Sequence, residues 1–280
     1  MFERKRVFIL VKTYPTISEK YSELVCTAGV LENGEWVRLY PIPFRLLNNS
    51  QKFPKYNWID VDIERNTSDF RVESYRPDLD SIYVEPELPK IKGKVDWEKR
   101  REIVFNGQPI YTDLQSLIDE AKRDKKSLAI FKPSKVKRLL VEKVSDQWDK
   151  EKLAGLKRQA AQMNMFKTPE ELEEDFKVVK KVPYRFRYEF EDDQGKNATV
   201  MIEDWEIGML YWNCLCRHKN DQQAAIEDVR KKYYDEYMQK DLYFFMGTSK
   251  QYHNVSPNPF LIIGVFPLPK EMDNKQISFL

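Results

Sequence analysis

Three side chains between residues 36 and 40 are of the types that bind nucleic acid. Trp36, Arg38 and Tyr40 alternate with apolar residues, and alternate side chains of an extended strand share one face. Two aromatic rings with a guanidinium between them can stack on bases and contact phosphate groups. We therefore predict that this strand face contacts nucleic acid.

Basic residues elsewhere are predicted to extend this surface. Residues 90–158 contain 19 Lys or Arg against 11 Asp or Glu, and Lys135 and Lys137 would share one face of a strand that starts after Pro133. The alternative is a solvated surface in which charges of both signs are interspersed. The predicted nucleic-acid-binding residues are Lys12, Tyr14, Trp36, Arg38, Tyr40, Arg45, Lys135 and Lys137.

Two carboxylates, Asp204 and Glu206, flank Trp205 at an expected strand-to-helix junction. Such a pair can bind a divalent ion or transfer protons. Asp is also a preferred N-cap residue, and Glu in a first helical turn interacts favourably with the helix dipole. We favour these structural roles and predict no catalytic residue.

Cys214, Cys216 and His218 are too few for a zinc site, because a structural zinc needs four ligands and a catalytic zinc needs three plus water. No phosphate-binding loop is present: residues 247–250 lack the upstream glycine of that motif. We predict no metal and no cofactor.

The C-terminal residues resemble a partner-binding peptide. Gln276, Ile277, Phe279 and Leu280 match the short peptide by which bacterial proteins dock on the replicative sliding clamp. Residues 270–274 are a polar spacer, which would suit a tethered tail that binds a partner. The alternative is an apolar tail that folds back on its own domain.

Short strands must position these residues. Asn33 and Gly34 predict a two-residue hairpin turn between the strands of residues 25–31 and 36–40. A helix that starts at Thr112 carries Leu114, Leu117, Ile118 and Ala121 on one face, and we expect it to plug or flank the first barrel. From residue 184 onward, two strands, two helices and two strands follow in the order of an OB barrel.

The fold class predicted is α+β and β-rich: two OB-like small barrels with helical insertions and a helical connector. We assign residues 1–146 to an N-terminal OB-like domain and residues 147–181 to the connector. Residues 182–270 would form a C-terminal OB-like domain, and residues 271–280 a flexible tail.

Short motifs across most of the chain resemble those of one known family. They are residues 12–15, 35–41, 204–206, 245–248 and 260–266. These segments resemble the bacterial and phage dual OB-domain proteins, and the resemblance implies two OB folds and a nucleic-acid context but no reaction. Relatives often carry cysteines and a Gly-His pair before Asp204, whereas residues 192–197 are Asp-Asp-Gln-Gly-Lys-Asn here. This departure argues against a metal.

Length and composition limit the alternatives. A chain of 280 residues can form two domains, each with its own core. The net charge of +2 is nearly neutral, so a nucleic-acid site must be a local patch. Three cysteines without a disulfide pattern favour a reducing compartment, and the N-terminal apolar run is too short for a signal peptide or membrane span. We expect a cytoplasmic protein that does not contact membranes.

These observations favour a non-catalytic module that binds or senses single-stranded DNA or RNA, in a bacterial antiviral or mobile-element system. Two alternatives remain open. One is a metal-dependent nuclease or nucleotide-processing enzyme that uses Asp204 and Glu206. The other is a scaffold that recruits proteins and has no affinity for nucleic acid.

Overall fold

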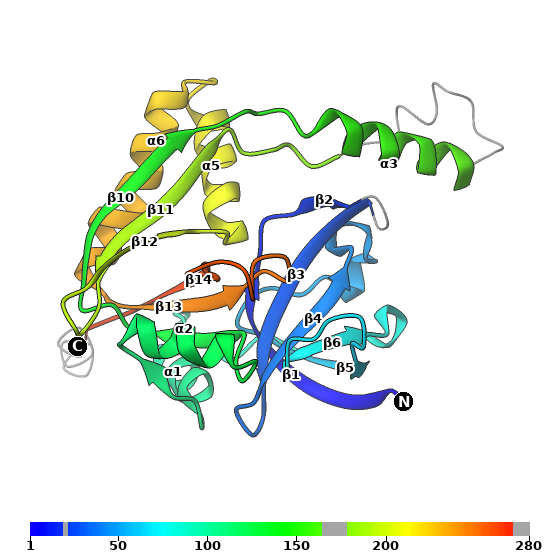
Figure 1. The fold of residues 1–280 in the computed structure, drawn as a ribbon, viewed down its shortest axis with the longest axis horizontal. Helices are drawn as coiled ribbons and strands as arrows, with labels where there is room; N and C mark the ends of the chain where they lie inside the picture. Colours follow the sequence, from blue (N-terminus) through cyan, green and yellow to red (C-terminus); the bar gives the residue numbers. More distant parts are fainter. Residues whose placement is uncertain (19–21, 164–177, 271–280) are drawn as a thin grey trace.

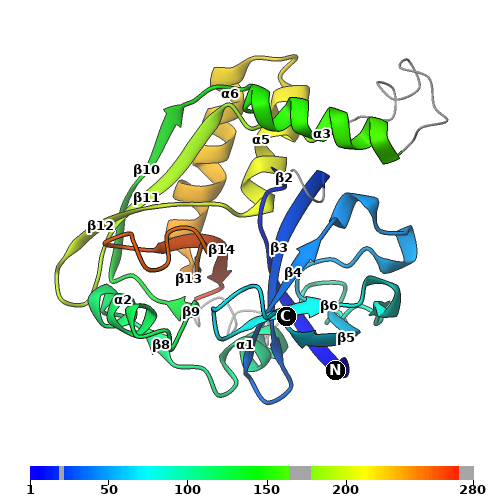
Figure 2. The ribbon, with the colours of Figure 1, turned by 45° about the vertical axis from the view of Figure 1, so that its right-hand side comes forward.

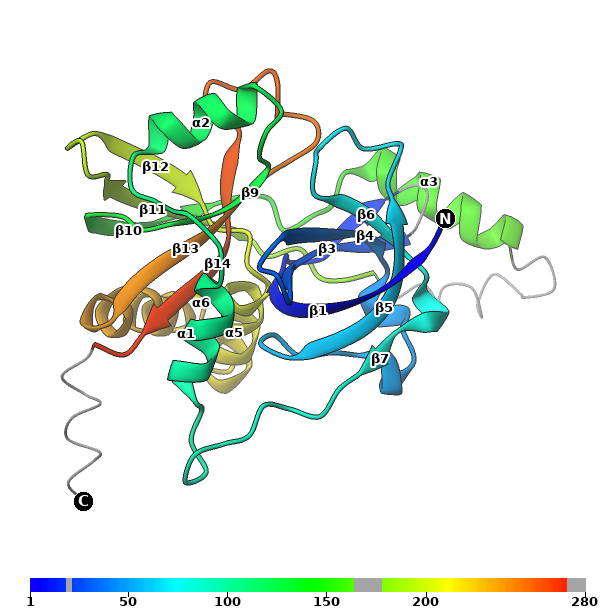
Figure 3. The ribbon, with the colours of Figure 1, turned by 90° about the horizontal axis from the view of Figure 1, so that it is seen from below.

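The computed structural model describes residues 1–18, 22–163 and 178–270. This part of the chain is a β-rich α+β fold whose two halves lie side by side in Figure 3. We call residues 1–106 the barrel half and residues 110–270 the second half. Among the described residues, no helix has the length and apolar character needed to cross a membrane.

Five strands close a barrel in the order β1-β3-β4-β6-β5, and β5 pairs back with β1. The β4–β6 pairing is parallel and the other four are antiparallel. One of the two predicted OB-like barrels is therefore present. The strands of this half are β1 (Glu3–Lys12), β2 (Thr16–Ser18), β3 (Ser22–Leu31), β4 (Trp36–Ile42), β5 (Trp58–Arg65), β6 (Ser74–Pro77) and β7 (Tyr83–Val84).

The hairpin that joins β3 to β4 has a different turn from the one predicted. Leu31 N donates to Glu35 O at 2.9 Å, so the loop has three residues rather than two. Gly34 has a φ of 85°, as expected at the last position of such a loop. A Cβ on Gly34 would lie 1.9 Å from Asn106 O, so a side chain there is excluded by both conformation and space.

As far as it is described, the second half contains two sheets and no closed barrel. One sheet has the order β10-β11-β12 and the other the order β14-β13-β9-β8. Within the described residues they are joined through the bridge between Ile202 and Ile262, and no ladder links β10 to β8 or β9. The predicted second barrel is therefore wrong. The strands are β8 (Ile110–Tyr111), β9 (Leu128–Phe131), β10 (Lys135–Lys143), β11 (Tyr184–Glu191), β12 (Asn197–Met201), β13 (Asp241–Thr248) and β14 (Phe260–Leu268).

The boundary between the halves differs from the predicted boundary at residue 146. β9 pairs with β13, and β10 pairs with β11, so residues from 110 onward belong to the second half. The expected connector does not separate two domains; it leaves the second half after β10 and returns to it at β11. In Figures 1 and 2 its helix α3 (Lys150–Met163) lies above β2 and projects away from both sheets. Residues 164–177 of the expected connector and the predicted tail of residues 271–280, with its partner-binding residues, lie outside the described residues.

The remaining helices pack mainly in the second half. α2 buries the four residues predicted, but in the core of the second half rather than against the barrel. The helices are α1 (Trp97–Phe105), α2 (Leu114–Lys122), α5 (Trp205–Arg217) and α6 (Gln222–Arg230). Short helical turns are η1 (Phe44–Leu46), η2 (Asn49–Gln51), η3 (Leu79–Ser81), the π-helical η4 (Lys231–Glu236) and η5 (Tyr237–Gln239).

The two halves share a hydrophobic core. Phe8 and Trp36 of the barrel pack with Ile130, Phe245 and Phe266 of the second half, and the Trp36 and Phe245 ring centroids are 6.0 Å apart. In OB folds the face of the second and third barrel strands usually binds the ligand. Here those strands are β3 and β4, and the second half covers a large part of their outer face.

Candidate nucleic-acid interface

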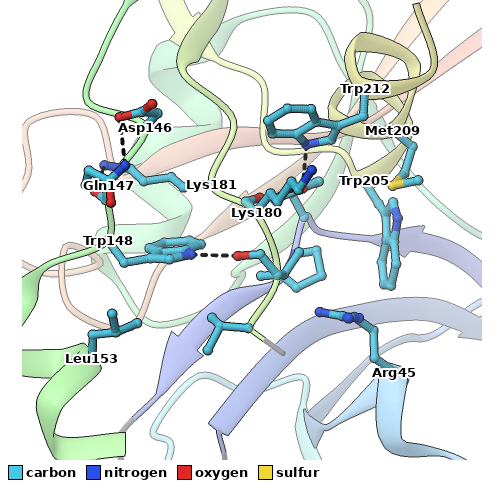
Figure 4. A pocket seen from close by; sticks show the side chains of 14 residues that line it. Arg45, Asp146, Gln147, Trp148, Leu153, Lys180, Lys181, Trp205, Met209 and Trp212 are labelled. Atoms are coloured by element: carbon cyan, nitrogen blue, oxygen red, sulfur yellow. Dashed lines mark hydrogen bonds between the residues drawn. The ribbon is translucent and has the colours of Figure 1, made fainter. Parts of the chain in front are cut away.

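A groove of about 1020 Å³ lies where the barrel half meets α5 and the segments on either side of α3. Figure 4 shows the side chains that line it. They include three tryptophans, three cations and one carboxylate. The lining residues are Tyr14, Pro15, Arg45, Asp146, Gln147, Trp148, Leu153, Val178, Val179, Lys180, Lys181, Trp205, Met209 and Trp212.

One wall of the groove is a face of α5. Trp205, Met209 and Trp212 follow one another at intervals of four and three residues, so they lie on the same side of the helix. The Asp204 side chain accepts a hydrogen bond from Glu206 N at 3.2 Å and caps this helix, which confirms the predicted N-cap. The cap fixes where α5 begins and therefore where Trp205 stands.

Tyr14 of the barrel half contacts both α5 and the segment that returns from α3. Its hydroxyl accepts from Trp212 Nε1 at 2.8 Å and donates to Lys180 O at 2.7 Å. Burial raises the pKa of Tyr14, so the phenol stays protonated and can donate. The ring lies against Gly208, where a Cβ would come within 2.3 Å of Tyr14 Cδ2. Glycine at this position allows the ring to lie directly on the helix.

The opposite wall is formed by two parts of the expected connector. Trp148 Nε1 donates to Val179 O at 2.7 Å, and Lys181 Nζ donates to Gln147 O at 3.1 Å. These bonds hold the outgoing and returning segments together beside the groove. Trp148 is half-buried, so part of its ring remains available to a ligand.

Positive charge lies next to the aromatic rings. Lys180 Nζ is 5.6 Å from the Trp212 ring centroid, and Lys181 Nζ is 5.9 Å from that of Trp148. Arg45 donates to both carboxylate oxygens of Glu23, at 2.7 and 2.8 Å. Cations beside exposed ring faces are suited to a polyanion that carries flat bases.

Two predicted binding residues, Tyr14 and Arg45, therefore lie in this groove. Trp36 and Arg38 do not, since they are only 6% and 2% exposed and the second half covers them. In this arrangement neither can contact a strand that runs along the outside of the barrel. Tyr40 is half-buried and lines a separate, smaller cavity.

The other predicted lysines also lie outside the groove. Lys12 Nζ donates to Phe53 O at 2.9 Å and lies 4.3 Å from the Phe44 ring centroid. Burial lowers the pKa of Lys12 to about 8. Lys135 and Lys137 are on β10 in the second half, where Lys137 pairs with Glu191 at 2.7 Å. Their assignment to nucleic-acid binding remains a prediction.

Asp204 and Glu206 are paired with a lysine from the barrel half. Lys55 Nζ lies 3.1 Å from Asp204 Oδ2 and 3.0 Å from Glu206 Oε2. Burial alone would lower the pKa of Lys55, but the two carboxylates outweigh it and raise that pKa well above its usual value. An ammonium therefore stands between the carboxylates that were considered for a divalent ion. Among the described residues, no three His, Cys, Asp or Glu side chains are grouped as metal ligands.

Most residues that line the groove were not predicted from the sequence. Trp148 and Lys180 are 32 positions apart, in a region predicted only as a connector. One signal was present: Trp205 and Trp212 are spaced so that both fall on one helix face.

Comparison with protein families agrees with the structural boundary. Residues 3–106 match the domain of unknown function DUF8758, and residues 111–280 match the domain of unknown function DUF8757. The second match covers more than half of the chain. The chain belongs to the DUF8757 family. No curated protein matches the sequence. The two families divide this DUF8757 protein between α1 and β8, where the halves meet.

Proposed function

We propose that this protein binds single-stranded nucleic acid in the groove between the barrel half, α5 and the segments beside α3. The observation that carries the proposal is the combination of three tryptophans with Arg45, Lys180 and Lys181 in one groove of about 1020 Å³. Indole rings stack on bases without strong sequence preference, and the cations contact the backbone. Bases in a duplex are already stacked on one another, so a single strand is the form that can use these rings.

The burial of the outer face of β3 and β4 supports the groove as the binding site for the nucleic-acid strand. The resemblance to dual OB-domain proteins suggests a strand across β3 and β4, but Trp36 and Arg38 of that face are buried under the second half. The groove begins at Tyr14 and Arg45, at the edge of the same barrel. A strand bound here would therefore contact the barrel at its rim.

The three cysteines are all free, which supports the cytoplasmic location expected from the sequence.

Two substitutions test the groove by anisotropy titration of a labelled oligothymidylate. Trp148→Leu should weaken binding about 5- to 150-fold, which corresponds to the roughly 1–3 kcal/mol of one stacked base. Trp148→Phe should restore part of the loss, because a ring remains. Tyr83→Leu removes a ring that is 57% exposed on β7 and should leave the affinity unchanged.

The salt dependence tests the charge contribution. Lys180→Gln should reduce the slope of log affinity against log salt by about 0.7, the value for one phosphate contact on a single strand. Lys143→Gln removes an exposed lysine at the end of β10 and serves as the matched control. If folded Trp148→Leu and Lys180→Gln proteins bind as tightly as the parent, the groove is not the site.

A further inference from the structure

A second cavity, of about 240 Å³, remains on the barrel face that the second half covers. Its floor is formed by β3 and β4, with Cys26, Arg38 and Tyr40. Loops of the barrel half and residues 247–250 of the second half form the rim. The volume is below the roughly 300–1,000 Å³ of pockets that hold drug-sized ligands. The cavity therefore suits a small group rather than a stacked base.

The floor carries a buried positive charge, and no carboxylate of the described residues contacts it. Arg38 is 2% exposed; one terminal nitrogen donates to Ser127 O and Oγ, both at 3.0 Å, and the other to Cys26 Sγ at 3.4 Å. Its Nε is buried without a hydrogen-bond acceptor. In the part of the chain that the structure describes, no ion pair involves Arg38; Glu73 acts on it from beyond Ser127, whose Oγ donates to Glu73 Oε2 at 2.6 Å. Buried charges are normally paired, because desolvation is costly.

Two further cations line the same cavity. Arg71 donates to Asp69 at 2.9 and 2.6 Å and to Thr248 O, across the interface, at 2.5 Å. Lys250 lies at the exposed rim, where its Nζ donates to Ser68 O at 2.5 Å. Asp69 neutralises Arg71 directly, so among the described residues the charges of Arg38 and Lys250 remain without a carboxylate in contact.

One carboxyl group in the cavity opposes this charge only weakly. Glu203 lines the wall, and burial raises its pKa. The charge of Arg185 opposes this shift without reversing it. A carboxyl group that is more easily protonated repels an anion less and, when protonated, can donate a hydrogen bond to one.

We propose that this cavity binds a terminal phosphate monoester, with its charge directed toward Arg38 and with Lys250 at the entrance. The cavity volume of about 240 Å³ leaves little space beyond one phosphate group. A terminal phosphate therefore fits it better than an internal phosphodiester, which continues into a nucleotide on both sides. The monoester is either that of a free mononucleotide or the end phosphate of a nucleic-acid strand.

Two binding measurements on the full chain distinguish these sources. In the first, isothermal titration with inorganic phosphate and with a nucleoside 5′-monophosphate should show binding of both. In the second, oligothymidylates with and without a 5′- or 3′-phosphate are compared by anisotropy. Tighter binding of one phosphorylated end identifies a strand terminus, whereas equal binding of all the oligonucleotides together with mononucleotide binding identifies a free ligand. No binding of phosphate, of mononucleotide or of any terminal phosphate would overturn the proposal.

Opposite charge changes at the cavity should have opposite effects on phosphate binding. Lys250→Glu should weaken it at least tenfold, since a hydrogen bond between charged groups contributes roughly 1.5–3 kcal/mol. Glu203→Gln should strengthen it, because the amide carries no negative charge and can donate a hydrogen bond. Lys143→Glu, at an exposed position of β10, should have no effect. Equal loss in the Lys143 and Lys250 variants would show non-specific charge attraction and contradict the cavity as the site.

Phosphate binding in the cavity and oligonucleotide binding in the groove can be tested separately. Lys180→Gln and Trp148→Leu change the groove and should leave phosphate binding unchanged. Arg38 is not a suitable first substitution, because its contacts with Ser127 join the two halves and its loss can unfold the protein. Lys250 is exposed, so its replacement should preserve the fold, which circular dichroism would verify.

Discussion

The Lys55 ammonium lies 3.1 Å from Asp204 Oδ2, and both side chains are almost fully buried, with 4% and 0% exposure. Asp204 also caps α5. A single carboxylate thus fixes the start of a helix and joins that helix to the barrel half. Burial raises the pKa of Asp204 to about 6, against the opposing effect of Lys55, which reflects the cost of placing this charge in the interior.

Removing either partner of this pair should be strongly destabilising. An N-cap alone would tolerate Asp204→Asn, because asparagine keeps an oxygen acceptor. Here Asn would leave Lys55 with Glu206 only, so we expect Asp204→Asn and Lys55→Met each to cost about 3–5 kcal/mol of unfolding free energy. The double variant should lose less than the sum. Chemical denaturation measures the cycle, and strictly additive losses would contradict the coupling.

Gly208→Ala should disturb the groove through Tyr14. Alanine favours helix over glycine by about 1 kcal/mol, but its Cβ would lie 2.3 Å from Tyr14 Cδ2, and overpacking typically costs about 1–3 kcal/mol. We expect lower thermal stability and weaker oligothymidylate binding. Asn213→Ala, at an exposed position of the same helix, is the control. An unchanged affinity in a folded Gly208→Ala protein would show that the Tyr14 position is unimportant for binding.

The protein should lose stability in acid partly through Asp69. Burial alone would raise the pKa of Asp69, but the hydrogen bonds from Arg71 outweigh it and hold that pKa well below the usual 3.8. Such a group stabilises the fold above its unfolded pKa, and this contribution is lost as the pH falls below about 4. Asp69→Asn should therefore be less stable at pH 7 and lose less on acidification. Denaturation curves across this range test it, with exposed Asp235→Asn as the control; parallel curves for Asp69→Asn and the parent would contradict the prediction.

A fragment that ends at residue 146 should not fold independently. It would contain β9 and β10 without their partners β13 and β11, and it would expose the apolar face that Trp36 shares with Phe245. Circular dichroism and proteolysis of residues 1–146 should show an unfolded or aggregated chain. Co-expression with residues 147–280 should restore a protected complex. A monomeric, protease-resistant fragment would support the boundary first predicted from the sequence.

The features that were predicted correctly are determined by residues close together in the sequence. The β3–β4 hairpin follows from alternation around Gly34, and the cap of α5 follows from Asp204 beside its own helix. The contacts of Arg38 and Lys55 were missed because their partners are distant: Ser127 is 89 positions from Arg38, and Asp204 is 149 positions from Lys55. Periodicity assigns a residue to a strand face, but it does not show that another sheet covers that face.

The segment between β10 and β11 is an insertion that begins and ends at one edge of the sheet. Lys143 and Tyr184 are paired neighbours at the ends of β10 and β11, so everything between them leaves and re-enters the sheet at adjacent points, like a greatly lengthened hairpin loop. This insertion supplies Trp148, Lys180 and Lys181. Its replacement would alter one groove wall while the strands on either side keep their pairing. Exchange of this loop would therefore change the groove with little disturbance of the two sheets.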